Sequence, residues 1–393
     1  MGLTLGIDLG TTYSSAAFIA NGEVRLVADE RGEVCFPSVV HYPAEGLPLV
    51  GTAACRARVM DAAHTVSGVK RLLGQSVDSP SARLFEAMCA CRMVPDKQGG
   101  AALMFRGRVR SAIAVAADLI AYLKDRAEQT AGRPIQRALI TVPVSASLRA
   151  RNATEAAARM AGFTFVSSAY EPLAGAIASN VGVEAGDRRF MVYDFGGGTF
   201  DVCVVEQREH RFFMRAMGGD ACLGGDDFDE QLVRQVARDV WARHRIELHH
   251  DVIRLERIQR KCEQVKRALS VSMVARLKLE DAYSHEDEAI GIDRRFHRDE
   301  VELLWSDLVE RSIVLSARTL VDAQMRPTDL SDVVLIGGTT HIPMVKREVA
   351  RVFQRPIRQH DDPQTTVAIG AAILGAQPDA VGVDAPDCFL ASA

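Results

Sequence analysis

Two short hydrophobic runs flank a glycine-rich turn near the middle of the chain. Residues 190–193 and 202–205 are apolar, and three successive glycines lie between them. Short β-rich runs on either side of a glycine turn predict a β-hairpin. The same order occurs near the N-terminus, where the alternating residues 3–7 lead into a turn at 8–12 and a second apolar run follows at 16–19. This repetition predicts a duplicated lobe.

Both turns carry the same candidate chemistry. Each is entered by an aspartate, Asp8 or Asp194, and each contains threonine. Glycines let backbone N–H groups approach an anion closely, because they have no side chain and adopt positive φ at little cost. The aspartate can hold hydrated Mg²⁺, and the hydroxyl of Thr199 can bond a phosphate oxygen or an attacking water. One such turn is equally compatible with an ordinary hairpin, but two favour a nucleotide site that holds one polyphosphate between them.

The remaining pattern alternates helices and strands, which predicts an α/β fold. Periodicity and capping residues predict helices at 113–129, 147–161, 171–178, 228–245, 254–270 and 298–323, and strands at 138–142, 163–166 and within 277–296. An apolar strand at 333–336 runs into Gly337 and Gly338 and then into a helix start, an arrangement that offers an anion or nucleotide contact. Residues 75–110 contain prolines and a glycine pair with weak periodicity, so we expect an irregular smaller subdomain there.

Length and charge narrow the class of protein. A chain of 393 residues that is 48% hydrophobic can bury large cores and should form at least two domains. The formal net charge of -4 carries no polyanion-binding signature, so we expect no nucleic-acid partner. The sequence has no run of about 18 uncharged apolar residues, so we expect no membrane span, and its start does not resemble a signal peptide. We therefore expect a cytoplasmic location.

The cysteines and histidines give no metal signature. Only Cys89 and Cys91 of the eight cysteines lie close together. A Cys-x-Cys pair without a second pair or a nearby histidine is a poor zinc site, so we expect reduced thiols. His249 and His250 have no spaced ligand partner, and we expect a solvated helix end there.

Together these motifs resemble the ATPase domain of the heat-shock protein 70 (DnaK-type) chaperones. The resemblance rests on the two glycine turns, Lys70, Glu171 and the Gly337-Gly338 loop, and it covers about residues 3 to 376. It implies an actin-like ATPase fold with ribonuclease H-like duplicated lobes, each with an inserted subdomain.

The resemblance also implies domain limits. Lobe I would span 1–185 with an inserted subdomain at about 40–111, lobe II would span 186–377 with one at about 226–300, and a tail at 378–393 would follow with no peptide-binding domain. The tail does not match the family's hydrophobic linker, so the chain is either an excised ATPase domain or a natural truncated relative. The stretches 32–33 and 362–372 resemble most the specialised bacterial branch called HscC.

The site implied by the resemblance holds ATP or ADP with Mg²⁺ between the lobes. The phosphates would contact Gly10, Thr11, Thr12 and Tyr13 from one lobe and Gly196, Gly197, Gly198 and Thr199 from the other. The catalytic residues would be Lys70, Glu171, Asp194, Thr199 and Asp201. The Mg²⁺ would be held by Asp8 and Asp194, largely through water. The adenosine would lie between two sets of residues: Glu263, Lys266, Arg267 and Ser270, and Gly337, Gly338, Thr339 and His341. Without the resemblance, the charges at 261–267 would indicate a solvated helix face.

Several positions depart from the family pattern. Ser167 and Tyr170 stand where the family usually has arginine and asparagine, near the surface that couples the lobes to partners. Ser145 and Leu148 stand where tyrosine and aspartate are common, and Gln364 replaces an aspartate near the nucleotide. His341 likewise stands where arginine is more frequent. We therefore expect ATP binding to be retained and coupling to a J-domain to be altered.

Three functional hypotheses follow. The first is a chaperone domain that hydrolyses ATP slowly to ADP and phosphate and uses lobe opening and closing as its signal. Its implied partners are a J-domain co-chaperone and a nucleotide exchange factor; the client is undefined, and we expect a monomer. The second is a nucleotide-gated regulatory or scaffold module in which turnover is incidental. The third, a small-molecule kinase of the same fold, needs a base for the substrate hydroxyl, and no segment clearly supplies one.

Overall fold

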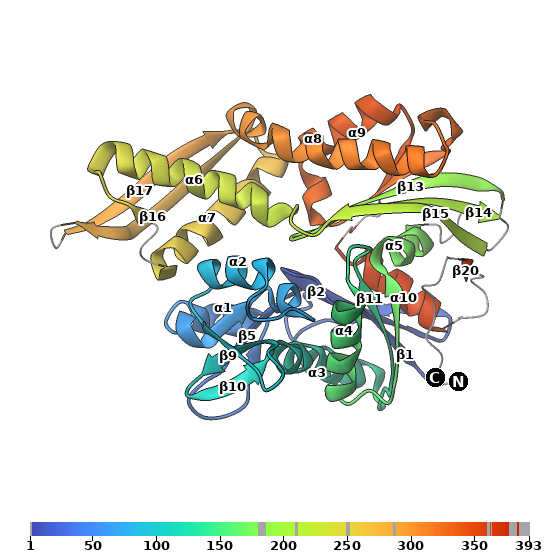
Figure 1. Ribbon diagram of the computed structural model, residues 1–393, viewed down its shortest axis with the longest axis horizontal. Coiled ribbons are helices and arrows are strands. Elements are labelled where there is room, and N and C mark those ends of the chain that lie inside the picture. The colour runs from blue at the N-terminus through green and yellow to red at the C-terminus, as the bar shows by residue number, and fades with distance from the viewer. Residues whose placement is uncertain are drawn as a thin grey trace.

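The chain folds into two lobes that lie one above the other (Figure 1). The structure is a computed structural model, and it describes residues 2–179, 186–208, 211–248, 252–285, 288–359, 362, 364–376 and 383–384. His249, His250 and most of the predicted tail lie outside the described residues. Within the described part, the strands form two six-stranded sheets and three smaller ones. The mixture of helices and strands agrees with the predicted α/β class.

The first large sheet is centred on the N-terminal hairpin. Its order is β12-β11-β1-β2-β3, with β4 also paired to β2, and its strands are β1 (Thr4–Asp8), β2 (Tyr13–Ala20), β3 (Glu23–Leu26), β4 (Phe36–Pro37), β11 (Arg137–Val142) and β12 (Phe165–Tyr170). Strand β1 pairs antiparallel with β2 and parallel with β11. The predicted hairpin is confirmed, but β12 begins two residues later than the apolar run at 163–166 suggested.

The second large sheet repeats this plan. Its order is β19-β18-β13-β14-β15-β20, and its strands are β13 (Arg188–Phe195), β14 (Phe200–Arg208), β15 (Arg211–Asp220), β18 (Asp332–Ile336), β19 (Ile357–Gln359) and β20 (Val383–Asp384). Strand β13 pairs antiparallel with β14, up to Phe195 opposite Phe200, and parallel with β18. The two hairpins therefore occupy equivalent places in two sheets that share the same order of five strands, as the repeated pattern predicted, while the sixth strands β4 and β20 differ in their pairing.

Two helices cross between the sheets and join the lobes. Helix α5 (Glu171–Ser179) packs against β13 and β18 of the second sheet, α10 (Thr366–Ala376) packs against β1 and β11 of the first, and the two helices contact each other (Figure 1). Close packing requires small residues here, because a Cβ on Gly6 would lie 2.2 Å from the backbone nitrogen of Ala372. One hydrophobic cluster accordingly draws on both halves of the chain, with Leu139 and Leu173 from the first and Val192 from the second.

Other elements cover the sheets or extend from them. They are α1 (Thr52–Arg58), α2 (Pro80–Met88), α3 (Ala112–Ala131), α4 (Leu148–Met160), α6 (Gly225–His244), α7 (Val252–Val271), α8 (Arg298–Asp322) and α9 (Pro343–Phe353), with strands β5 (Val39–His41), β6 (Leu49–Val50), β7 (Thr65–Ser67), β8 (Arg92–Pro95), β9 (Ala101–Phe105), β10 (Arg108–Ser111), β16 (Val274–His285) and β17 (Glu288–His297). Helices α3 and α4 contact the first sheet, and α8 contacts β14 and β15 of the second. Within the described residues, none of the helices is long and apolar enough to cross a membrane.

The expectation of an irregular stretch at 75–110 was wrong. This region contains α2 and the sheet β10-β9-β8. Its prolines and glycines mark the ends of elements and do not break them. Pro80 is the first residue of α2 after the cap Ser79, and Pro95 is the last residue of β8. Asp96 accepts hydrogen bonds from the N–H groups of Gln98 and Gly100 in the β8–β9 turn.

Candidate functional site

The two glycine turns face each other across the space between the lobes. A Cβ on Gly197 would lie 2.2 Å from Oγ1 of Thr12, and a Cβ on Gly198 would lie 3.0 Å from Oγ1 of Thr11. Contacts below 3.0 Å do not occur for real Cβ atoms, so glycine at 197 is a steric requirement of the closed arrangement. The predicted approach of the two turns is therefore present in the structure.

The second turn is fixed to the start of α6. The N–H groups of Gly225 and Asp226 donate to the carbonyl oxygens of Gly196 and Gly197 at 3.0 and 2.7 Å. The Thr339 hydroxyl, which follows β18, donates to the same Gly196 oxygen at 2.8 Å. The turn is thus held from two sides by its own lobe, which keeps its shape independent of the opposite lobe.

A cavity of about 440 Å³ lies between the turns. Its lining includes every predicted site residue except Asp201: Asp8, Gly10, Thr11, Thr12, Tyr13, Lys70, Glu171, Asp194, Gly196, Gly197, Gly198, Thr199, Glu263, Lys266, Arg267, Ser270, Gly337, Gly338, Thr339 and His341. These residues come from segments up to about 330 positions apart, and the fold brings them to one space.

Carboxylates gather at one end of this cavity. Asp194 and Glu171 are buried, and Nζ of Lys70 donates to Oε1 of Glu171 at 2.6 Å. Desolvation, and next the charge of Glu171, raise the pKa of Asp8 to about 7 and the pKa of Asp194 well above its usual value. Desolvation alone would lower the pKa of Lys70, but the carboxylates of Glu171 and Asp8 outweigh it and the net pKa is raised.

This cluster fits a bound cation. One ammonium group compensates several carboxylates, so the site favours additional positive charge. Among the described residues, however, no group of three or more His, Cys, Asp or Glu side chains is placed to coordinate a metal directly. A divalent ion with a retained water shell, as Mg²⁺ commonly has, is compatible with both observations.

Asp201 does not line the cavity, but its charge acts on Asp194 and Lys70, which do. Its side chain is buried, and its Oδ1 accepts from the backbone N–H of Ser145 at 3.3 Å, in the loop after β11. Burial, and then the charge of Glu171, raise its pKa to about 7. Sequence spacing placed Asp201 at the end of the turn but could not show that it points to the opposite lobe.

The comparison with known families agrees with this geometry. The family model described as Hsp70 protein matches residues 4–380. The chain belongs to the Hsp70 family. Members of this family are ATPases, and they share the actin-like ATPase fold, which accounts for the five-strand order that the two sheets share and for the cavity between the lobes.

Helix α7 supplies another part of the cavity lining in this Hsp70 family member. The Tyr13 hydroxyl donates to Oε1 of Glu263 at 3.0 Å, and Nη1 of Arg267 donates to the Tyr13 oxygen at 3.0 Å. The guanidinium of Arg267 also lies over the Tyr13 ring, 5.4 Å from its centroid. The charged run on α7 is therefore not simply a solvated face, because two of its members contact the first lobe.

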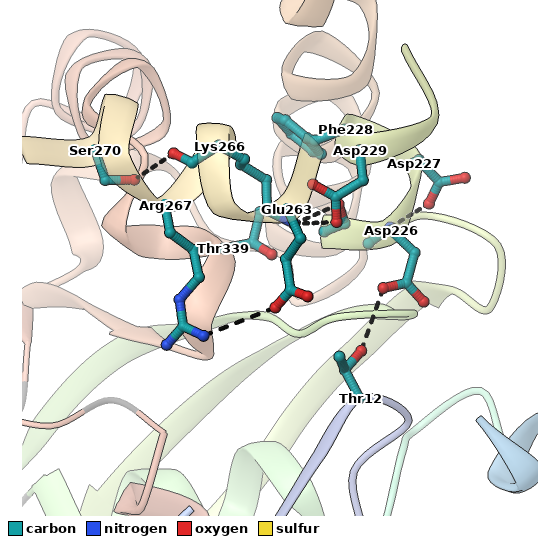
Figure 2. Close-up of polar contacts among 12 residues, drawn as sticks. Thr12, Asp226, Asp227, Phe228, Asp229, Glu263, Lys266, Arg267, Ser270 and Thr339 are labelled. Atoms are coloured by element: carbon teal, nitrogen blue, oxygen red, sulfur yellow. Dashed lines mark hydrogen bonds and ion pairs between the residues drawn. The ribbon is translucent and has the colours of Figure 1, made fainter. Parts of the chain in front are cut away.

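Lys266 points into the second lobe and has little freedom. Its Nζ donates to Oδ2 of Asp229 and to the carbonyl oxygen of Gly225, both at 2.7 Å (Figure 2). Ser270 donates to the carbonyl oxygen of Lys266 at 3.3 Å. Burial raises the pKa of Asp229 to about 7, although the Lys266 ammonium opposes this shift. Lys266 thus contributes to the cavity wall while it stabilises the start of α6.

The glycine pair after β18 closes the remaining side. Gly337 has a φ of 83°, and a Cβ there would lie 2.3 Å from the carbonyl oxygen of Phe195, so the second turn and this loop approach each other directly. His341 ends the short helix that follows and is exposed at the cavity. Partial burial, and then the charge of Lys346, lower the pKa of His341.

Sequence reasoning missed part of the lining. The additional residues are Gly225, Asp226, Asp229, Val271, Ile342, Lys346 and Val367, whereas Gln364 had been placed near the nucleotide by the resemblance and does line the cavity. Three of them belong to the glycine-acid loop at 224–229, where the glycines were a visible signal of a close backbone approach. The others carry no local pattern that marks them, and only the fold brings them to the cavity.

Proposed function

We propose that this chain binds Mg-ATP in the cavity between the lobes and hydrolyses it slowly to ADP and phosphate. The observation that carries the proposal is a cavity of about 440 Å³ that both glycine turns and the Lys70 cluster line together. Membership of an ATPase family supports the same reaction. Opening and closing of the lobes would be the output, because both lobes supply residues to one ligand.

The glycine turns would hold the phosphates. Backbone N–H groups of residues 10–13 and 196–199 would approach from opposite lobes, aided by the hydroxyls of Thr11, Thr12 and Thr199. The adenosine would occupy the end lined by α7 and by the loop 337–341. Glu263, Lys266, Arg267 and Ser270 would lie on one side of it and Gly337, Gly338, Thr339 and His341 on the other.

The carboxylate end would perform the chemistry. Asp8 and Asp194 would hold Mg²⁺ largely through water, and this ion would neutralise charge on the phosphate oxygens. Lys70, oriented by its ion pair with Glu171, would place an ammonium charge at the transferring phosphoryl group. Asp201 and Thr199 would help to order the attacking water. Phosphoryl transfer depends mainly on positioning and electrostatic stabilisation, so no covalent nucleophile is required.

We propose more specifically that this chain is a DnaK-type chaperone domain that acts in the cytoplasm as a monomer. We propose lobe limits of 1–185 and 186–377, with inserted subdomains at about 40–111 and 226–300. A J-domain co-chaperone and a nucleotide exchange factor would be its partners. Ser167 and Tyr170, which differ from the residues usual in the family, lie on β12, so we propose that coupling to a J-domain is altered.

Release of inorganic phosphate from ATP tests the proposal. The complete chain is incubated with ATP and Mg²⁺ and no other acceptor, and a parallel sample contains EDTA. We expect slow, Mg²⁺-dependent release of one phosphate per ATP. ATP binding without release would favour the nucleotide-gated module, and release only after addition of a small-molecule acceptor would favour a kinase.

A further inference from the structure

Asp226 connects the two glycine turns, although they belong to different lobes. Its backbone N–H donates to the Gly197 carbonyl oxygen of the second turn at 2.7 Å. Its Oδ1 accepts from the Thr12 hydroxyl of the first turn at 3.2 Å (Figure 2). One residue thus contacts both turns, with its backbone on one side and its carboxylate on the other.

The second carboxylate oxygen of Asp226 holds a cation from the first lobe. Nη2 of Arg71 donates to Oδ2 of Asp226 at 2.8 Å, and both side chains are about three-quarters buried, at 23% and 26% exposure. The same Arg71 nitrogen would lie 2.9 Å from a Cβ on Gly198, so the guanidinium abuts the second turn itself. Asp226 is the second residue of α6, where the helix dipole favours a negative charge.

Arg71 shares a short 3₁₀ helix with Lys70. This helix spans Val69–Leu72, and its two basic side chains reach in different directions, Lys70 to Glu171 and Arg71 to Asp226. Lys70 and Arg71 are neighbours in this short helix. A contact that fixes Arg71 against the second lobe therefore also restricts the backbone that carries Lys70 toward the carboxylate cluster.

We infer that Asp226 is a positioning residue that clamps the lobes shut at the phosphate end of the cavity and sets Lys70 in place through Arg71. This inference rests on the proposed function, because its consequence for ATP depends on that site. Arg58 of α1 and Glu256 of α7 form another ion pair between the lobes, and this pair joins the two helices and not the two glycine turns. The Asp226 clamp acts at the phosphates themselves.

Two substitutions and a matched control test the clamp. Asp226→Asn removes the charge pair, and Arg71→Gln removes its partner. Asp220→Asn is the control, because Asp220 accepts from Arg311 at 2.6 Å within the second lobe and has a similar side-chain exposure of 24%. We expect Asp226→Asn to release a fluorescent ADP about tenfold faster and to hydrolyse ATP about tenfold more slowly in a single turnover, the size of one charge-assisted hydrogen bond. Asp220→Asn should match the parent.

A double variant distinguishes a positioning role of Asp226 from a general loss of structure. The double variant Arg71→Gln with Asp226→Asn should be no worse than either single variant, because both remove the same interaction. Urea unfolding of the nucleotide-free proteins should give similar stabilities for Asp226→Asn and Asp220→Asn. Additive effects on release, or effects that follow stability alone, would overturn the inference.

A measurement without nucleotide keeps the inference separate from the proposed function. Small-angle X-ray scattering of the nucleotide-free chain should show a larger radius of gyration for Asp226→Asn than for the parent and Asp220→Asn. If the parent neither binds nor hydrolyses ATP, the proposed function is wrong. The scattering comparison still tests whether Asp226 holds the lobes together, because it needs no nucleotide. Identical scattering profiles would overturn the clamp.

Discussion

Gly370 of α10 lies directly against the backbone of Ala174 in α5, so that a Cβ on residue 370 would be 1.7 Å from the Ala174 carbonyl oxygen. At this contact the backbones of the two helices that join the lobes leave no room for a side chain on residue 370. Gly370→Ala must therefore separate the helices or distort one of them. We expect it to lower the free energy of unfolding by about 1–3 kcal/mol or more, the usual cost of overpacking a close contact.

Urea denaturation of the complete chain measures this cost. Gly186→Ala is the control, because a Cβ on Gly186 would meet nothing within 4 Å. The control should unfold like the parent. If Gly370→Ala and the parent have the same urea midpoint of unfolding, α10 and α5 pack less tightly than this contact indicates.

Gly197→Ala should weaken nucleotide binding by more than tenfold. The added Cβ would lie 2.2 Å from Oγ1 of Thr12, so the two turns could not approach each other as they do here. The loss should follow from the geometry of the closed lobes and not from unfolding, since the turn lies at the cavity surface. Isothermal titration with Mg-ATP measures the affinity, with Gly186→Ala again as the control. An unchanged affinity would show that closure of the turns is not needed for binding.

Asp229 should make stability depend on pH in a defined direction. Burial raises its pKa from 3.8 to about 7, with Lys266 opposing, so the folded state holds a proton that the unfolded state has released between these values. The contribution of this group to the free energy of unfolding therefore falls as the pH rises from about 4 to 7, because the unfolded state binds fewer protons there than the folded state. The parent should lose stability relative to Asp229→Asn across this range.

Unfolding in urea at pH 5, 6, 7 and 8 tests the sign. Glu230→Gln is a suitable control, because Glu230 is the neighbouring carboxylate and forms an exposed ion pair with Arg234. The difference between the parent and Asp229→Asn should shrink or reverse as the pH rises, and the difference for Glu230→Gln should stay flat. A parent that gains stability relative to Asp229→Asn would mean that the Lys266 ion pair outweighs burial.

The sequence indicated the local parts of the site and missed contacts between distant segments. The glycine turns were visible because a hairpin and its glycines are encoded within about a dozen residues. The pair of Arg71 and Asp226 was not, since its partners lie 155 positions apart and meet only when the lobes close. Asp201 shows the limit in another way, because its position in the strand was predictable, while the hydrogen bond that it accepts from the backbone of Ser145 in the other half of the chain was not.

The error at residues 75–110 has a different origin. Prolines and glycines are ambiguous in a sequence, because the same residues break elements or mark their ends. Here Pro80 begins α2 and Gly100 lies in the β8–β9 turn. Periodicity over elements of four to nine residues was too short to decide between these meanings.

Lys70→Ala is the variant that tests the central claim most directly, with ATP affinity and single-turnover hydrolysis measured on the same protein in Mg²⁺. Lys70 contacts Glu171 at 2.6 Å and lines the cavity, but the glycine turns that would hold the phosphates do not depend on it. We expect ATP to bind within a few-fold of the parent affinity and hydrolysis to fall by about 10² or more, as for loss of one preorganised electrostatic group. Hydrolysis at the parent rate with ATP bound would contradict the assignment of this cluster as the catalytic site.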